Sequence, residues 1–206
     1  MSITDKTDEE MSKLEDLSHP ILILVRGLPG SGKSYLAVAI QESIGKDRAV
    51  VIDPDKIDLS SKEYTDLSTT LTAEGVDSKF HPYRFLRSKA YKAIISHQII
   101  IWNQAFTNLD GFNKTIINLQ AFAAEQGTRL PVLVVEVEVN EAIARERVAK
   151  REEQGGHGVS EGAFARFISE YESFADKGYN IVAVHGENDV AVSVSSVTKA
   201  LEDLPE

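Results

Sequence analysis

The sequence contains no cysteine and no long apolar run, and both absences restrict what the protein can be. Without thiols, the chain forms no disulfide and offers no thiolate ligand to a metal, which fits a reducing cytoplasm. The longest aliphatic run, ILILV at 21–25, is far too short to cross a bilayer. Residues 1–17 lack the basic and then apolar pattern of a signal peptide. We therefore expect a cytoplasmic protein with no membrane partner.

Positive charge is also scarce: the chain has 22 lysines and arginines but 32 aspartates and glutamates, which gives a net charge of −10. Binding of a long nucleic acid depends on cations that neutralise its phosphates, so a polynucleotide is a disfavoured partner. A small anion in a local basic pocket is still allowed. Residues 1–18 hold six acidic residues and two lysines and are predicted to be an acidic leader. Residues 19–206 are long enough for one domain with a substantial core.

Short apolar runs alternate with amphipathic segments along this domain. Such alternation predicts an α/β fold with a mostly parallel five-stranded sheet sandwiched between helices. The expected strands are at 21–27, 49–53, 98–103, 130–139 and 179–186. The expected helices are at 34–45, 82–97, 109–126, 140–153, 160–178 and 189–204, whereas the polar segment 56–80 is left unassigned.

The stretch GLPGSGKS at 27–34 follows the first strand and opens the first helix, and it matches G-x-x-x-x-G-K-[ST]. Main-chain N–H groups of such a loop cradle a triphosphate, and a side chain at the inner glycines would block that approach. The lysine reaches the terminal phosphates, and the serine hydroxyl can ligate Mg²⁺. The alternative is a glycine-rich turn without a ligand. The predicted nucleotide contacts are Gly27, Leu28, Pro29, Gly30, Ser31, Gly32, Lys33, Ser34 and Tyr35. This motif predicts a P-loop NTPase fold.

Two carboxylates, Asp53 and Asp55, follow the second strand in VIDPDKID. The carboxyl ends of parallel strands border the ligand crevice, where a carboxylate can accept a proton from a hydroxyl or orient Mg²⁺. Asp53 joins Ser34 as a metal-site candidate. Asp-Pro-Asp is also good turn chemistry, which is the alternative interpretation.

Three arginines lie on the segment ARERVAKREE, before the glycine-rich loop GGHG. Arg147 and Arg151 are four residues apart and share a helix face, so both can stabilise charge on a transferring phosphate. Arg145 points in another direction and is a further candidate nucleotide contact. Residues 145–160 are predicted to be a mobile lid. A solvated helix with glutamate–arginine pairs is the alternative.

Taken together, RGLPGSGKS, the Asp-x-Asp after the second strand, R-x-x-x-R and a VSxxxFxRF-type helix resemble the zeta-toxin and polynucleotide-5′-kinase group, over about residues 20–190. That resemblance implies a P-loop kinase built like nucleoside monophosphate kinases, with ATP (or GTP) and Mg²⁺. It implies that the acceptor hydroxyl loses its proton to Asp55, with Asp53 as runner-up. It also implies phosphate contacts from Arg147 and Arg151. A toxin would need an inhibitory protein partner.

One position departs from that group, since the third strand ends at Asn103 where related proteins commonly carry an acid. An amide can still hydrogen-bond a substrate or a metal-bound water.

The acceptor site is expected in residues 56–92, where Arg84 and Arg87 can form a basic helix face, and next to Trp102, which can stack on a base or sugar. A surface helix and a core tryptophan are the alternatives.

Two functions are consistent with these features. The first is a phosphotransferase that moves the γ-phosphate to a hydroxyl of a small molecule such as a nucleoside, nucleotide or (amino) sugar, with Asp55 as base and Lys33, Arg147 and Arg151 carrying the developing charge. The second is a nucleotide-binding regulatory or interaction protein with weak or no kinase activity. Asn103 favours the second, and the paired aspartates and arginines favour the first.

Overall fold

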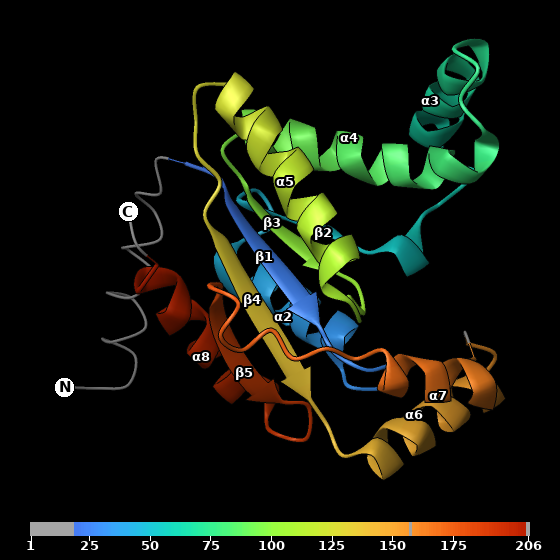
Figure 1. Ribbon diagram of the computed structural model, residues 1–206, viewed down its shortest axis with the longest axis vertical. Coiled ribbons are helices and arrows are strands. Elements are labelled where there is room, and N and C mark those ends of the chain that lie inside the picture. Colours follow the sequence, from blue (N-terminus) through green and yellow to red (C-terminus); the bar gives the residue numbers. More distant parts are fainter. Residues whose placement is uncertain (1–18, 157, 205–206) are drawn as a thin grey trace.

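The computed structural model describes residues 19–156 and 158–204, and it contains one sheet of five parallel strands in the order β2-β3-β1-β4-β5 (Figure 1). The predicted fold class is confirmed, and so is the place of each predicted strand. The predicted leader at 1–18 lies outside the described residues. The strands are β1 (Ile21–Arg26), β2 (Ala49–Ile52), β3 (Ile99–Asn103), β4 (Val132–Glu138) and β5 (Asn180–His185).

The centre of the sheet is β1, which pairs with β3 on one side and β4 on the other. Every residue of β1 is buried, because helices cover both faces of the sheet. This double burial explains why ILILV is continuously apolar and does not alternate with polar residues. Its carboxyl end leads directly into the glycine loop.

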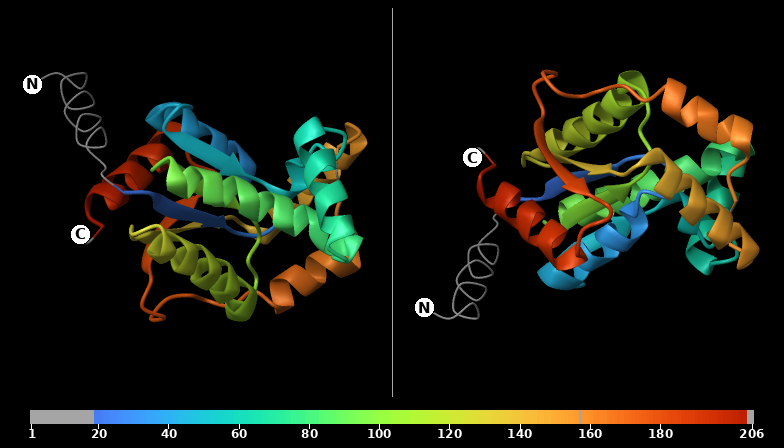
Figure 2. Two further views of the ribbon diagram at one scale, coloured as in Figure 1. Left: turned by 90° about the horizontal axis from the view of Figure 1, so that it is seen from above. Right: turned by 90° about the horizontal axis from the view of Figure 1, so that it is seen from below.

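Two pairs of helices cover the two faces of the sheet (Figure 2). On one face, α2 (Lys33–Ile44) and α8 (Val190–Glu202) pack on the odd-numbered residues of β1, such as Ile23. On the other face, α4 (His81–Ile95) and α5 (Leu109–Glu125) pack on the even-numbered ones, such as Leu24. Side chains of successive strand residues point to opposite faces, so β1 contributes to both cores.

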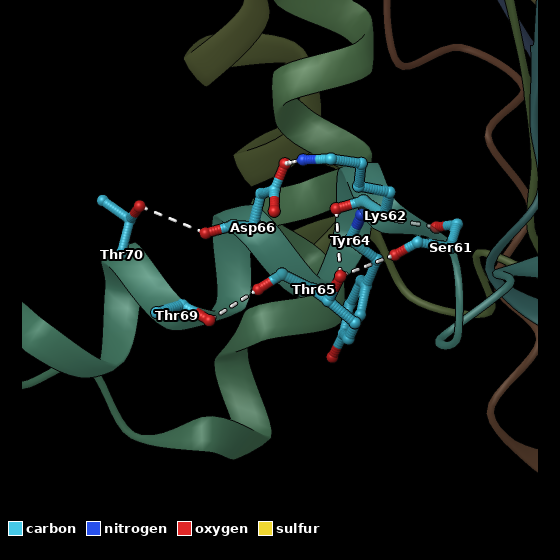
Figure 3. Close-up of polar contacts among 7 residues, drawn as sticks. All are labelled: Ser61, Lys62, Tyr64, Thr65, Asp66, Thr69 and Thr70. Atoms are coloured by element: carbon cyan, nitrogen blue, oxygen red, sulfur yellow. Dashed lines mark hydrogen bonds and ion pairs between the residues drawn. The ribbon is translucent and has the colours of Figure 1, made fainter.

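The segment left unassigned at 56–80 contains a helix, α3 (Lys62–Ala73), between the short turns η1 (Pro54–Lys56) and η2 (Ser78–Phe80). Several of its polar side chains form hydrogen bonds within the helix. Figure 3 shows the hydroxyls of Thr69 and Thr70 donating to the carbonyls of Thr65 and Asp66, one turn earlier. Such local bonds compete with the helical ladder, which explains why the composition did not indicate a helix.

Two further helices, α6 (Glu141–Glu153) and α7 (Glu161–Ser169), form the region predicted to be a lid. They share a small core of their own, in which Ala144 and Val148 of α6 pack with Phe164 of α7. Both helices begin at side-chain caps, since Asn140 accepts from Ala142 N–H and Ser160 accepts from Ala163 N–H.

The predicted helix at 160–178 is wrong beyond Ser169, where α7 ends. Residues 170–179 instead run as an irregular segment from α7 to β5 (Figure 1). Phe174 is fully buried there and packs against Phe112 of α5. The carbonyl of residue 172 also accepts a hydrogen bond from Arg26. Both contacts depend on the tertiary structure, which helical periodicity in the sequence does not reveal.

Candidate active site

The glycine loop joins β1 to α2, and three of its glycines have positive φ. A Cβ at Gly27 would lie 2.5 Å from the carbonyl oxygen of Val137, and one at Gly30 would lie 2.3 Å from that of Ala144. These two glycines therefore let the loop pack against the main chain of β4 and α6. Only the space over Gly32 is open, with its nearest heavy atom 4.0 Å away. The motif predicts that the glycines leave room for phosphate; this internal packing is a second role that the motif does not reveal.

Lys33 opens α2, and its ammonium folds back on the loop, where Nζ donates to the carbonyl of Leu28 at 2.8 Å. Burial lowers the pKa of Lys33 to about 8, although the carboxylates of Asp55 and Asp53 act in the opposite direction. Arg151 lowers that pKa further. Both aspartates and Arg151 thus lie within electrostatic range of Lys33, although the four residues come from three separate segments of the chain.

A hydrogen-bonded triad at the ends of β2 and β3 joins Ser34, Asp53 and Asn103. The Asn103 amide donates to Asp53 Oδ2 at 2.7 Å and to Ser34 Oγ at 2.8 Å, and Ser34 Oγ lies 3.3 Å from Asp53 Oδ2. The other oxygen of Asp53 accepts the main-chain N–H of Asp55 at 3.0 Å. Asn103 is 4% exposed, and its Oδ1 is buried without a partner among the described residues.

This triad fits a magnesium ion that is shared with phosphates. Mg²⁺ at such sites keeps several waters and takes few protein oxygens, and the adjoining Ser34 hydroxyl and Asp53 carboxylate provide two. The unpaired Oδ1 of Asn103 can accept a hydrogen bond from a metal-bound water. A cage of three or more acidic or histidine side chains is absent from residues 19–156 and 158–204.

Asp55 differs from Asp53 in its surroundings. Asp53 is 8% exposed and both of its carboxylate oxygens are engaged. Asp55 is exposed on η1, and within the described chain its carboxylate accepts no hydrogen bond, while its charge acts on Lys33. The Asp53 carboxylate therefore stabilises the local structure, whereas the Asp55 carboxylate is accessible to a ligand.

The lid arginines take different positions. Arg147 is exposed, and its Nη1 reaches the carbonyl of Gly30 at 3.4 Å, over the glycine loop. Arg151 is close enough to Lys33 to lower its pKa. Arg145 instead pairs with Glu141 and Glu161 and lies 4.4 Å from the ring centroid of Phe164. A phosphate would have to displace those carboxylates to bind Arg145.

A pocket of about 380 Å³ opens beside the start of α2. The predicted nucleotide contacts Gly32 and Tyr35 line it, together with Arg147 and the turn from His185 to Asn188 after β5. The carbonyl of Ser31 packs so closely on Gly186 that a Cβ there would lie 1.9 Å from it. This pocket is therefore continuous with the phosphate loop and has room for a nucleoside.

A second pocket, of about 420 Å³, lies between α4, α5 and the loop after β3. Of the predicted acceptor residues, Arg87 and Trp102 line it, whereas the exposed Arg84 does not. Trp102 is 5% exposed, and its indole N–H donates to Gln104 at 3.1 Å. Tyr83, within the expected acceptor region, also lines it. Sequence reasoning missed the other polar and aromatic lining residues, whose spacing carries no signal: Gln104, Phe106, Thr107, Asn108, Phe112, Lys114, Thr115 and Phe167.

The fold is shared with solved structures of P-loop kinases. A gluconokinase from Sinorhizobium meliloti matches with a TM-score of 0.54 and 18% identity, covering 90% of this chain and 93% of that one. Deoxyadenosine kinase from M. mycoides with bound dATP matches at 0.51 and 20%, covering 88% and 99%. The PezAT chromosomal toxin–antitoxin system of Streptococcus pneumoniae matches at 0.55 and 15%, covering 98% and 96%.

Sequence comparison identifies the family more closely than fold does. No curated protein sequence matches the chain significantly. The family model for zeta toxin, however, matches residues 4–194, which is most of the chain. The resemblance expected from the motifs is thereby confirmed, and the protein belongs to the zeta toxin family.

Proposed function

We propose that the protein is a magnesium-dependent phosphotransferase that moves the γ-phosphate of ATP (or GTP) to a hydroxyl of a small molecule. The observation that carries this proposal is the convergence of Lys33, Asp55 and Arg151 in one electrostatic cluster. Phosphoryl transfer needs positioning and charge stabilisation more than covalent chemistry, and such a cluster supplies both. The pocket beside the loop provides space for a donor, and the pocket between α4, α5 and the loop after β3 provides space for an acceptor.

The donor side uses the glycine loop and the pocket of about 380 Å³. Main-chain N–H groups at the start of α2 face the phosphates, and the helix dipole favours their negative charge. The ammonium of Lys33 exchanges the Leu28 carbonyl for phosphate oxygens. Ser34 and Asp53 would hold Mg²⁺, which would neutralise phosphate charge. The guanidinium groups of Arg147 and Arg151 carry charge that develops during transfer.

The acceptor side uses Asp55 as the general base. Its exposed carboxylate can accept the proton of a hydroxyl without breaking a bond in the protein, whereas Asp53 would have to give up Asn103 or the N–H of Asp55. Trp102 and Arg87 in the pocket of about 420 Å³ suit an acceptor with a flat or sugar-like face and an anionic group. Nucleosides, nucleotides and (amino) sugars meet that description.

The test is phosphoryl transfer to a panel of such acceptors, with ADP and phosphorylated products followed by mass spectrometry. Asp55→Asn should reduce transfer by about 10²-fold or more, the usual contribution of a positioned base, while nearly keeping the affinity for ATP. Lys33→Ala should abolish transfer and weaken ATP binding. Asp58→Asn is the matched control, because this exposed carboxylate bonds only to Ser60 and its own turn.

The same assay separates the kinase from a nucleotide-binding regulator. ADP that accumulates only when an acceptor is present supports the kinase. ADP that forms slowly and equally with and without every acceptor would contradict it and favour the regulatory role that Asn103 suggested. If Asp53→Asn loses transfer and Asp55→Asn does not, the base has been assigned to the wrong carboxylate.

A further inference from the structure

Glu172, three residues after α7 ends, touches three segments that are far apart in the sequence. Its main-chain N–H donates to the carbonyl of Thr107 at 2.8 Å. Its carbonyl accepts from Arg26 Nη2 at 2.8 Å. Its carboxylate Oε2 accepts the N–H of Leu109 at 3.0 Å. One residue therefore connects β1, the loop after β3 and the start of α5.

The bond to Arg26 connects Glu172 to the phosphate loop. Arg26 is the last residue of β1, immediately before Gly27, and it is 0% exposed. It pairs with Glu136 of β4, and its guanidinium carbon lies 3.5 Å from the ring centroid of Phe174 and 4.2 Å from that of Tyr171. Burial lowers the pKa of Arg26, although Glu136 opposes that shift. An arginine held on so many sides is a rigid anchor for the Glu172 carbonyl.

The other connections lead to the wall of the pocket of about 420 Å³. Thr107 and Asn108 belong to that wall, and Leu109 is the first residue of α5, which supplies Lys114 to the pocket. A carboxylate at a helix N-terminus is favourable because it accepts an unpaired N–H and faces the positive end of the dipole. Phe167 of α7, five residues before Glu172, lines the same pocket.

Glu172 therefore lies at a junction between the donor and acceptor parts of the proposed site. A hydroxyl bound between α4 and α5 must face the γ-phosphate in line, and an error of about 1 Å in such an alignment can cost about 10² in rate. Glu172 bonds both to the pocket wall and to Arg26 at the phosphate-loop end of β1, and its side chain is itself exposed. The Glu172 carboxylate therefore contributes little to the packing of the hydrophobic core.

We infer that Glu172 is a positioning residue, which holds the acceptor-pocket wall against the anchored end of β1 and so aligns a bound acceptor with the phosphate loop. This inference rests on the proposed phosphotransferase function. The side chain acts at the N-terminus of α5, while the main chain of the same residue makes the links to Thr107 and Arg26. Substituting the side chain should loosen the wall without touching the nucleotide site.

The test compares Glu172→Ala, Glu172→Gln and Glu170→Ala with the unmodified protein. Glu172→Ala should lower kcat/KM for the acceptor that the panel identifies by about tenfold, because the bond to Leu109 is lost. Glu172→Gln should restore most of that loss, since an amide oxygen still accepts the N–H. The Kd of a fluorescent ATP analogue should stay unchanged in all variants. Glu170 is the matched control, as it is exposed and its carboxylate forms no hydrogen bond or ion pair with the described residues.

The two proposals fail in different ways. If the unmodified protein phosphorylates no acceptor, the phosphotransferase function fails and the inference falls with it. If the unmodified protein is active and Glu172→Ala has unchanged kcat/KM at a temperature well below melting, the positioning role alone is overturned. A loss in Glu172→Ala that Glu172→Gln does not reduce would likewise overturn it, because the hydrogen bond would not be its cause.

Discussion

At the scale of single residues, the site depends on charges whose state is set by burial. Lys33 is the clearest case, because its pKa falls from an ordinary 10.5 to about 8 while it bonds to its own loop. A lowered pKa means that, without a ligand, the ammonium form of Lys33 is less stable relative to the neutral amine than it is in a lysine exposed to water. A triphosphate would favour the ammonium again, so binding and protonation are linked.

We expect the affinity for ATP to fall as the pH rises above about 8. Below that pH, Lys33 already carries its proton, whereas above it the free protein holds a neutral amine and must take up a proton to bind. The Kd should then rise by up to about tenfold per pH unit. Titration of a fluorescent ATP analogue between pH 7 and 9 measures this. Lys33→Met should bind weakly with a nearly flat profile, and an equal Kd at pH 7 and 9 in the unmodified protein would contradict the linkage.

At the scale of elements, the phosphate loop and α6, in the region predicted to be a lid, are packed main chain to main chain. Gly30 lies against the carbonyl of Ala144 in α6, and Arg147 of the same helix reaches the carbonyl of Gly30. The lid region is therefore in contact with the loop through a glycine that has no room for a methyl group. Its own core around Phe164 keeps α6 and α7 together as one unit.

Gly30→Ala should push α6 away from the loop, and Gly45→Ala provides the matched control. Both glycines have positive φ, but a Cβ at Gly45 meets nothing within 4 Å. Gly45→Ala should lower the free energy of unfolding by about 1 kcal/mol through backbone strain alone. Gly30→Ala should lower it by about 3 kcal/mol, because overpacking is added, and should also weaken ATP binding. Urea unfolding and nucleotide titration measure the two effects; equal losses in both variants would show that the contact with Ala144 is unimportant.

At the scale of the whole molecule, the nucleotide site is built from several separate elements. The loop lies at the centre of the sheet between β1 and α2, while α6 and the turn after β5 reach it from other directions. A ligand that contacts all of them binds the folded state only. Ligand binding should therefore stabilise the whole domain and not one local element.

Magnesium and ATP at about 100 times Kd should raise the free energy of unfolding by about 2.7 kcal/mol. For a domain of this size, that corresponds to an increase in Tm of about 8 °C. Differential scanning calorimetry with and without nucleotide measures it, and Lys33→Ala at the same ATP concentration should show a much smaller increase. A Tm that no purine triphosphate shifts would contradict nucleotide binding at this loop.

No helix in the described part of the chain is both long and apolar enough to span a membrane. This agrees with the short apolar runs in the sequence. The position of each strand, the parallel sheet and the phosphate loop could also be predicted, because they depend on local patterns. A strand buried on both faces is continuously apolar, and a loop that must leave room for phosphate is rich in glycine.

The tertiary structure alone decided how distant residues meet. It paired Asn103 with Ser34 and Asp53, left Arg84 out of the pocket that Arg87 lines, and bound Arg145 to Glu161 of the next helix. It also ended α7 early so that Phe174 and the carbonyl of residue 172 could reach α5 and Arg26. Local periodicity indicates which side of an element is apolar. The partner that covers a side chain, or accepts its hydrogen bond, belongs to another segment of the chain, which local patterns do not specify.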